Sequence, residues 1–556
     1  DKVRSLKYVS ADGLSLIGRI SQATPAASQK KREAFTIGRL DFANIQAKII
    51  AGRNTVSFNA RNVRTDQLKM GQAFAWPRHV SGELTDVSVR TANSDAHVAQ
   101  LLVDYPRRVT GSEIKLSGPK YTVTATTGVI RRPEHQRHWM IERLSLGNVR
   151  LSSEARTLIA DSITVVSALL EPGNPQADRV DIYKPKASLG SSPTTANTGR
   201  PRLLDALPAR HVYLHPGEVT LANGHKVAFG LVHADREKHV VRASYVSTEL
   251  KKSSLTARNI SLEPNRITFD SILIIPNKKW YASLEVEETQ ILARFSRVTV
   301  REFFLDRYVG QRAAEDLDVE IGYADLDLRR NKLLPDPPPS KKPVTLDGLI
   351  SLPENVQVST LDIRDGRIQY RQISDKTGEE GYILMDKLVA TSRFDSLSSF
   401  ISLHARTNLY QSGLVELDYI TLAKDKFQLD IHVQDVDLTK LNQIVMPLQS
   451  LRIKSGYLKE YRLSVHADDD MATGDAAISY EGLHLELFKH DEPERKSLGT
   501  EVLTLLADGI ILKHSKENAR SPVNHPRVKH KSVFHYWVTS AIQGATGAIR
   551  KGKRRK

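Results

Sequence analysis

Short runs of alternating apolar and polar residues recur along this chain, and four of them share one layout. In each, an alternating run is followed by two turn-forming or polar residues, the second of them Gly, and then by another alternating run. These four repeats occupy residues 9–16, 212–221, 361–370 and 451–458. Asp-Gly and similar pairs between alternating runs are typical of β-hairpins. The pattern predicts a mainly β protein, built as a long curved antiparallel sheet of repeated hairpins.

The third repeat shows how a hairpin would sort the side chains. With a turn at Asp365-Gly366, Ile363 lies opposite Ile368, and the residues two positions further out also share that face. The other repeats gather Leu, Ile, Val and Ala in the same way. The predicted apolar face consists of Val9, Leu14, Leu16, Val212, Leu214, Val219, Leu221, Leu361, Ile363, Ile368, Tyr370, Leu451, Ile453 and Leu458.

The fourth repeat keeps this pattern only at its start. Tyr461 and Leu463 fall on the wrong side of a regular strand that carries Leu458 inward. An extra residue would restore the phase, so the sequence predicts a β-bulge near Lys459 or Glu460.

Composition shifts divide the strand pattern into blocks. We expect strand blocks at 1–185, 203–334 and 344–530, and an amphipathic helix with a basic tail at 531–556. The segment 186–202 is rich in Ser, Thr, Gly and Pro, and 335–343 is a Pro-rich connector. Such compositions are typical of linkers.

Four segments have helical spacing. Residues 94–105 carry apolar residues at i, i+3, i+4 and i+7, and 300–312 has a similar patch. Asp437 is placed to cap a helix over 438–445 that ends at Pro447. The last such segment is 533–549.

The last segment predicts an amphipathic helix with aromatic residues on one face. It carries Phe534, Trp537, Val538 and Ile542. The basic tail that follows contains Lys551, Lys553, Arg554 and Arg555. This combination fits a helix that closes the end of the sheet, and it also fits contact with a membrane surface; the sequence leaves both open.

The charge and composition narrow the choice of partners. The chain has 556 residues, no Cys and a net charge of +16, which favours an anionic partner. Because the basic residues are spread along the chain, we expect no nucleic-acid binding. There is no apolar run of 18 residues. The sequence begins at Asp1 within a strand-like pattern, so we expect it to be trimmed at its N-terminus; the sequence leaves open whether a signal peptide or membrane anchor preceded Asp1.

Residues with chemical potential do not form a recognisable active site. His211 and His215 would share a strand face, but no acidic residue completes a metal motif around them. The run 468–470 resembles the start of a calcium loop, yet positions 6 and 12 hold Thr473 and Ser479, so a hairpin loop is expected instead. The sequence thus predicts no enzyme, no cofactor and no metal.

The order of these elements resembles that of the AsmA-like family of bacterial envelope proteins, in forms associated with Bacteroidetes. The resemblance covers 317–549: a strand at 319–330, the Pro-rich connector, the repeat at 358–370, the segment 385–388, the capped helix at 437–442 and the closing stretch 532–537. It implies a curved sheet with an apolar groove, a location in the periplasm or at a membrane through an N-terminal anchor, and movement of phospholipid.

These observations lead to one favoured hypothesis and two competitors. The favoured one is a non-enzymatic envelope protein whose apolar groove binds or conducts phospholipid or another acyl-chain ligand, at a membrane surface and with other envelope proteins as possible partners. The second is a structural or interaction scaffold with a closed core. The third, an enzyme acting on envelope glycans, would need carboxylates gathered in one cleft.

Overall fold

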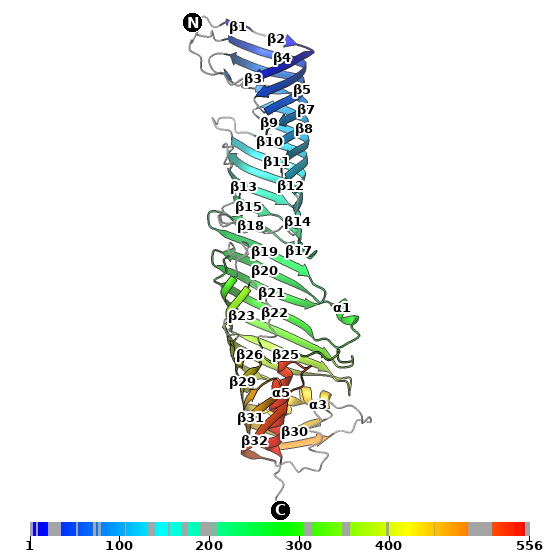
Figure 1. The fold of residues 1–556 in the computed structure, drawn as a ribbon, viewed down its shortest axis with the longest axis vertical. Coiled ribbons are helices and arrows are strands. Elements are labelled where there is room, and N and C mark those ends of the chain that lie inside the picture. The colour runs from blue at the N-terminus through cyan, green and yellow to red at the C-terminus, as the bar shows by residue number, and fades with distance from the viewer. Residues whose placement is uncertain are drawn as a thin grey trace, which may run out of the picture. The chain divides into compact units, whose positions relative to one another are not determined.

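The computed structural model describes most of the chain. Outside the described residues lie 21–34, 132–139, 190–203, 305–313, 347–355, 488–513, 551–556 and several shorter stretches. The chain divides into two compact units, Asp1–Thr248 and Glu249–Lys556. We describe each unit by itself (Figure 1).

Unit 1 is built of β-strands. They are β1 (Arg4–Leu6), β2 (Val9–Ala11), β3 (Leu14–Ile20), β4 (Phe35–Ala51), β5 (Asn54–Met70), β6 (Phe74–Ala75), β7 (His79–Arg90), β8 (Asp95–Tyr105), β9 (Arg108–Gly118), β10 (Tyr121–Arg131), β11 (Met140–Ser153), β12 (Arg156–Leu169), β13 (Gln176–Tyr183), β14 (Lys186–Leu189), β15 (Ala209–Leu214), β16 (Gly217–Thr220), β17 (Lys226–Phe229), β18 (Val232–Asp235) and β19 (Val240–Glu249).

Unit 2 combines strands with short helices. They are β20 (Ser253–Glu263), β21 (Arg266–Pro276), α1 (Lys278–Ala282), β22 (Gln290–Arg301), β23 (Ala314–Asn331), β24 (Val356–Ile363), β25 (Gly366–Ile373), β26 (Glu380–Asp395), β27 (Phe400–Leu409), β28 (Gly413–Ala423), β29 (Lys426–Asp437), η2 (Leu438–Leu441), α3 (Asn442–Gln449), β30 (Leu451–Ala467), β31 (Met471–Leu487), β32 (Lys516–Pro526) and α5 (Val533–Ile549). The mainly β class predicted from the alternating pattern is confirmed.

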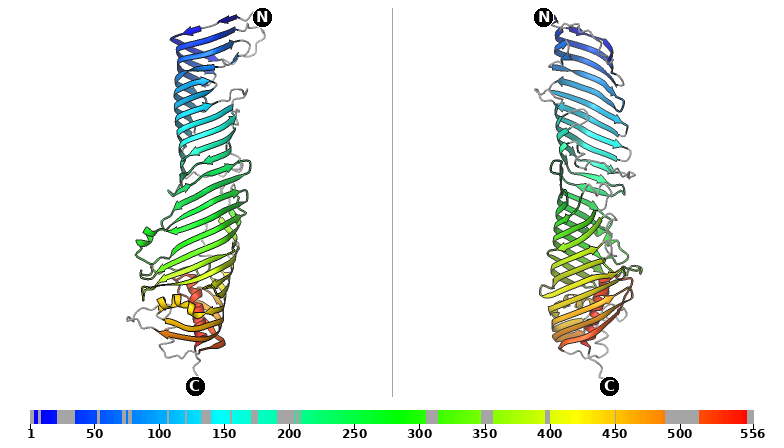
Figure 2. Two further views of the ribbon diagram at one scale, coloured as in Figure 1. Left: turned by 180° about the vertical axis from the view of Figure 1, so that it is seen from behind. Right: turned by 60° about the vertical axis from the view of Figure 1, so that its left-hand side comes forward.

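Within each unit, strands that follow one another in the sequence are mostly neighbours in the sheet (Figures 1 and 2). Most neighbours are antiparallel, but β1–β3 run parallel to β4, β13 and β14 run parallel to β15 and β16, and β23 runs parallel to β24 and β25. Parallel neighbours need a long return connection. Two of these connections contain the segments that composition marked as linkers, 186–202 and 335–343, although Lys186–Leu189 itself forms β14.

The four predicted hairpins are wrong. In the third repeat, β24 and β25 do not pair with each other; both run parallel to β23 with a constant offset and both pair with β26. The chain therefore continues in the same direction through Arg364-Asp365. The first and second repeats are interrupted strands of the same kind, and the fourth is the single strand β30.

The interruptions belong to a line of kinks that crosses each sheet. In unit 1, Asp86, Glu113 and Asn148 have positive φ and occur on alternate strands, and Lys184 has positive φ in the interruption between β13 and β14. Their neighbours across the sheet also drop out of the regular pairing. Side chains at the kinks also contact the neighbouring strand. Asn148 Nδ2 donates to Thr126 Oγ1 at 3.0 Å, and Lys184 Nζ lies 2.8 Å from the Asp161 carboxylate.

Unit 2 has a matching line of kinks. Asn259 and Arg297 have positive φ, and they lie beside Asp270 and Gly322 on the next strands. Asn259 Nδ2 donates to Asp270 Oδ2 at 2.8 Å. A positive-φ residue in a strand acts as a bulge that turns the chain and shifts the side-chain alternation.

The kinks reset which residues point inward. In β22, Ala293 and Val298 are both buried, and Phe295 packs in the same cluster as Val298, although an uninterrupted strand would place positions 295 and 298 on opposite faces. The same shift explains why the helix predicted at 94–105 is wrong. That segment is strand β8, whose kink places Val98 and Leu101 on one face at a spacing of three, as a helix would.

The other local predictions have mixed outcomes. The helix predicted at 300–312 is wrong where it can be seen, since β22 continues to Arg301; residues 305–312 lie outside the described part. Asp437 does act as an N-cap, accepting from Thr439 N at 3.0 Å, but the helical segment continues through Pro447 to Gln449. The predicted bulge in β30 is confirmed between Leu458 and Glu460.

The largest hydrophobic core of unit 2 forms where strands β28–β32 pack against α5, drawn in red at the C-terminal end in Figure 1. Ser532 caps this helix by accepting from His535 N. Trp537 packs against Tyr419 and Phe427 of the sheet, with ring centroids 5.3 and 6.4 Å away. The buried face thus includes Trp537, whereas Phe534 and Val538 are 52% and 56% exposed.

We expect Trp537→Ala to destabilise unit 2 by about 3–5 kcal/mol, because it leaves a cavity between α5 and the sheet. Phe534→Ala should change the free energy of unfolding by about 0.5 kcal/mol or less, because that ring is half exposed. Urea unfolding of the full chain followed by far-UV circular dichroism measures both. Equal effects of the two substitutions would contradict the docking of α5 through Trp537.

Candidate functional site

The apolar face of unit 2 is the most extensive feature that could bind a ligand. Residues paired across neighbouring strands share a face, so the register can be followed from strand to strand. Ile272 of β21 pairs with Phe295 of β22, Phe295 with Ala324 of β23, and Ala324 with Gly366 of β25. The neighbouring rows are apolar as well, as far as Leu328 and Tyr370; beyond them Arg330 pairs with Gln372.

This face, which we call the apolar face, extends over β20–β25. Its members are Leu255, Ala257, Ile260, Leu262, Ile267, Phe269, Ile272, Ile274, Ile291, Ala293, Phe295, Val298, Val300, Val319, Ile321, Ala324, Leu326, Leu328, Leu361, Ile363, Gly366, Ile368 and Tyr370.

Most large side chains of the apolar face are only half-buried. Phe269, Ile272, Phe295 and Leu326 retain contact with solvent, and Ile291 is 46% exposed. Only small or central residues such as Ala293 and Ala324 are fully buried. Among the described residues, therefore, no second layer covers this face as a layer covers the inner face of a β-sandwich.

The opposite face of the same strands is polar and internally neutralised. Arg367 pairs with Asp325 at 3.0 Å, Arg371 pairs with Asp327, and Glu320 lies between Arg301 and Arg364 at 3.0 and 3.3 Å. Hydrogen bonds from both arginines lower the pKa of Glu320. Most side chains of this face are polar, with Leu273, Ile275 and Leu292 as exceptions, so the two sides of the sheet have different solvent requirements.

Unit 1 repeats the arrangement. Val180 and Ile182 of β13 pair with Val212 and Leu214 of β15, and Ala187 of β14 pairs with Val219 of β16. Of the predicted groove residues in this unit, Val212, Leu214 and Val219 are half-buried members of this face. Leu221 lies beyond the end of β16 and is exposed.

Val9 pairs with Leu40, Leu14 with Ile45 and Leu16 with Ala47. Leu14 packs against the small core of Ile45 and Ala60.

The C-terminal part of the sheet is covered, which corrects three predicted groove residues. Leu451, Ile453 and Leu458 are 5–8% exposed, and the last two belong to the core beneath α5. They contribute to packing and not to an open groove. In contrast, Leu361, Ile363, Ile368 and Tyr370 do share one face, because a kinked strand and a hairpin give the same grouping.

The chain segment 335–346, which we call the strap, helps to cover this core. Val344 is buried against it, and Leu346 N donates to Tyr419 Oη at 3.2 Å. The strap corresponds to the predicted Pro-rich connector and the residues that follow it. It begins at Pro335, whose carbonyl accepts from Glu287 N at 2.8 Å.

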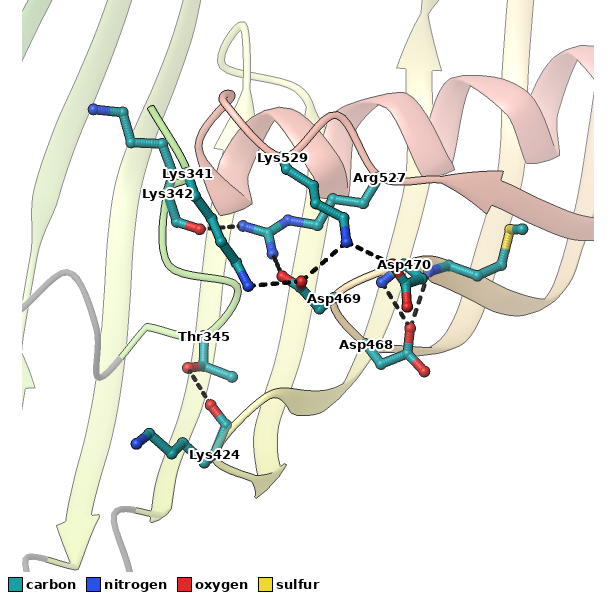
Figure 3. Close-up of polar contacts among 10 residues, drawn as sticks. Lys341, Lys342, Thr345, Lys424, Asp468, Asp469, Asp470, Arg527 and Lys529 are labelled. Carbon is teal, nitrogen blue, oxygen red and sulfur yellow. Dashed lines mark hydrogen bonds and ion pairs between the residues drawn. The ribbon is translucent and has the colours of Figure 1, made fainter. Parts of the chain in front are cut away.

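Charged groups fix the strap to the loop between β30 and β31 (Figure 3). Arg527, whose side chain is 1% exposed, pairs with Asp469 and donates to the Lys342 carbonyl at 2.5 Å. Lys341 lies 2.8 Å from Asp469, and its hydrogen bond lowers the pKa of that carboxyl. Asp468 instead accepts from the backbone of its own loop, as the predicted hairpin loop requires.

The carboxylates that a glycan-cleaving enzyme would need do gather at one place, a shallow hollow on the polar side of β28–β31. Glu416, Asp418, Asp430 and Asp475 line it. Glu416 and Glu460 both contact His432, at 3.5 and 2.8 Å. The hydrogen bond from His432 lowers the pKa of Glu460, whereas a general acid needs a raised one.

The two histidines that share a strand face in the sequence have separate partners. His215 Nε2 lies 3.1 Å from Asp181 Oδ1, and that carboxyl also receives two hydrogen bonds from Arg179. His211 instead faces His233 and Asp235 of β18. The sequence could not indicate this group, because its members come from different strands.

The predicted contacts of the C-terminal segment are partly visible. Phe534 and Val538 are exposed, Ile542 is half-buried and Trp537 is buried. Lys551, Lys553, Arg554 and Arg555 lie outside the described residues. Within the described part of the chain, no helix is both long and apolar enough to cross a membrane.

No protein-family model matches the sequence, and no curated protein matches it either.

The buried arginine should matter most for the strap. Replacing Arg527 by Met removes a partner of Asp469 and the donor to Lys342, so we expect a loss of about 1–3 kcal/mol and faster amide exchange over 342–346. Hydrogen exchange followed by mass spectrometry measures this. Lys529→Met is the control, because Lys529 contacts the same loop from a 50% exposed position and should have little effect. Unchanged exchange in R527M would contradict the role of Arg527.

Proposed function

We propose that the apolar face of unit 2 binds the acyl chains of an anionic phospholipid, and that the protein is a non-enzymatic lipid-binding protein of a bacterial envelope. The observation that supports it is the unbroken apolar register across β20–β25 on a face whose large side chains remain half-exposed. Exposed apolar areas of this extent are typical of ligand or partner sites. The location in an envelope rests on the family resemblance alone.

The dimensions of the face suit an acyl chain. The face covers five strand positions, namely β20, β21, β22, β23 and the position shared by β24 and β25, which are separated by four spacings, or about 19 Å. One leaflet of a bilayer supplies about half of its ~30 Å hydrocarbon core. An acyl chain lying across the strands would thus find apolar contacts along its whole length.

Charge at one edge of the face suits a phosphate headgroup. Lys251 and Lys252 lie in the turn before β20, and Lys278 and Lys279 in α1 after β21; all four are exposed. Lys251 Nζ lies 4.3 Å from the centroid of the Trp280 ring. A tryptophan beside lysines is a common arrangement where apolar and aqueous regions meet.

The covered C-terminal core gives the scaffold hypothesis its own support. There α5 and the strap occupy the inner side of the sheet, as a protein with a closed core would require. The two hypotheses differ at β20–β25, where a scaffold would need a protein partner and a lipid-binding protein would carry lipid.

The direct test is purification of the full chain without detergent, followed by mass spectrometry of an organic extract. We expect the extract to contain about one molecule of phospholipid per protein chain, or more. If the extract contains no lipid, and if the purified chain also fails to take up a fluorescent phospholipid from vesicles, the proposal is wrong.

A pair of adjacent residues allows a matched test of the face itself. Ile272 belongs to the apolar face, whereas Leu273 points to the polar side opposite Arg294. We expect Ile272→Glu to weaken phospholipid uptake at least about tenfold, since it places a charge among the acyl chains. Leu273→Glu should leave uptake near the wild-type value.

A second pair controls for folding. Ile291 on the apolar face and Leu292 on the polar side are 46% and 37% exposed, so a Glu at either position should be tolerated by the fold. We expect only Ile291→Glu to reduce uptake. Equal uptake by the two variants of each pair would exclude the apolar face as the binding surface.

A further inference from the structure

Three potential metal ligands meet on the polar side of unit 1. His211 lies in β15, and His233 and Asp235 lie in β18. His211 is paired directly with Asp235 across the two strands, and His233 is paired with Tyr213, one position further along the same face. Their ligand atoms all lie within 4.8 Å of one another.

The spacing of these atoms suits a single ion. His233 Nε2 lies 3.3 Å from His211 Nδ1, and His211 Nδ1 lies 3.9 Å from Asp235 Oδ2. Two nitrogens bound to tetrahedral zinc at about 2.0–2.1 Å are themselves separated by about 3.3–3.4 Å. The two imidazoles are therefore already at the required separation. The carboxylate has to approach His211 by about half an ångström, and it also has to approach His233, from which it lies within 4.8 Å.

The carboxylate is oriented for this role. Asp235 is 5% exposed at its side chain, and its Oδ1 accepts from Lys238 N at 3.0 Å. That hydrogen bond leaves Oδ2 directed at His211. A ligating carboxylate held by a backbone donor is the usual arrangement around protein-bound metals.

The rings are held in place by their neighbours. His233 stacks on Tyr213 with centroids 4.3 Å apart and planes 3° apart, and the Arg179 guanidinium lies 4.3 Å from the centroid of that same tyrosine ring. Arg179 is itself neutralised by Asp181 at 2.7 Å. Two cations stand close to the group: Lys238 Nζ lies 4.0 Å from Asp235 Oδ2 on a side chain that is 74% exposed, and Arg242 is paired with His233 across β18 and β19.

From this geometry we propose that His211, His233 and Asp235 form a binding site for a zinc-type divalent cation. Two imidazoles and one carboxylate suit Zn²⁺ or Co²⁺, and a water molecule would complete a tetrahedral set. The ion would join β15 to β18 on the side of the unit 1 sheet opposite Val212 and Leu214. The site is independent of the lipid-binding proposal.

The test uses the full chain, treated with a chelator and then dialysed. Titration with Co²⁺, followed by visible absorption, should show one tetrahedral Co²⁺ per chain, which Zn²⁺ then displaces. Zn²⁺ should also raise the melting temperature of the wild-type protein. If the wild-type chain shows no tetrahedral Co²⁺ band, the proposal is wrong.

Three variants assign the site. His233→Ala and Asp235→Asn should each weaken Co²⁺ binding by at least about tenfold and abolish the zinc-dependent rise in melting temperature. Asp235→Asn keeps the shape of the side chain and an acceptor for Lys238, so it guards against misfolding as the cause; far-UV circular dichroism checks both variants. His215→Ala, on the same side of the sheet but paired with Asp181, should bind Co²⁺ as the wild type does.

The contrary outcomes are equally distinct. Wild-type affinity in both His233→Ala and Asp235→Asn would show that the bound ion lies elsewhere. If His215→Ala lost as much Co²⁺ affinity as His233→Ala, the ion would not be bound specifically by His211, His233 and Asp235, and the proposal would likewise be wrong.

Discussion

The strict alternation of side chains along a β-strand is the constraint on which this structure depends. Every strand of the two units must keep apolar residues on one side and polar residues on the other over a long series of neighbours. A single kink would exchange the two sides in one strand and expose its apolar residues. The kinks instead form a line across each sheet, so that all neighbouring strands change phase at the same row. The bend is shared, and the apolar face remains continuous.

This arrangement explains why some features could be predicted from the sequence and others could not. Alternation is local, so the strands, the facing of Ile363 and Ile368, and the bulge after Leu458 could all be inferred. The direction of the chain after an interruption is not local. A turn at Asp365-Gly366 and a kink at the same place require similar residues, and the choice depends on pairing with β23 and β26. There Gly366 also permits close approach, since a Cβ would lie 2.7 Å from the Ala324 carbonyl oxygen.

The same limit applies to helical spacing and to sites. A kinked strand places Val98 and Leu101 on one face, and this mimics the spacing of a helix. The His211, His233 and Asp235 group joins two strands whose register the sequence does not reveal. By contrast, the cap at Asp437 and the helix at 533–549 depend on neighbouring residues only, and they could be predicted. The segments rich in Pro or Ser could be recognised as connections. Their length also indicates parallel pairing of the strands that they join, because antiparallel neighbours can be joined by a short turn.

The contrast between the two ends of the unit 2 sheet bears on function. Where β28–β32 pack against α5, the sheet carries large buried residues such as Phe427 and Tyr480, and the helix supplies Trp537 to meet them. Along β20–β25 most of the large side chains on the corresponding face are half-buried, and among the described residues no helix supplies a matching face. A helix or a chain segment could cover the apolar face of β20–β25 in the same way as α5 and the strap cover the core at β28–β32, a few strands away. This selective covering of one end is what the proposed binding of acyl chains would require, because acyl chains would have to enter and leave and need no specific side-chain partners.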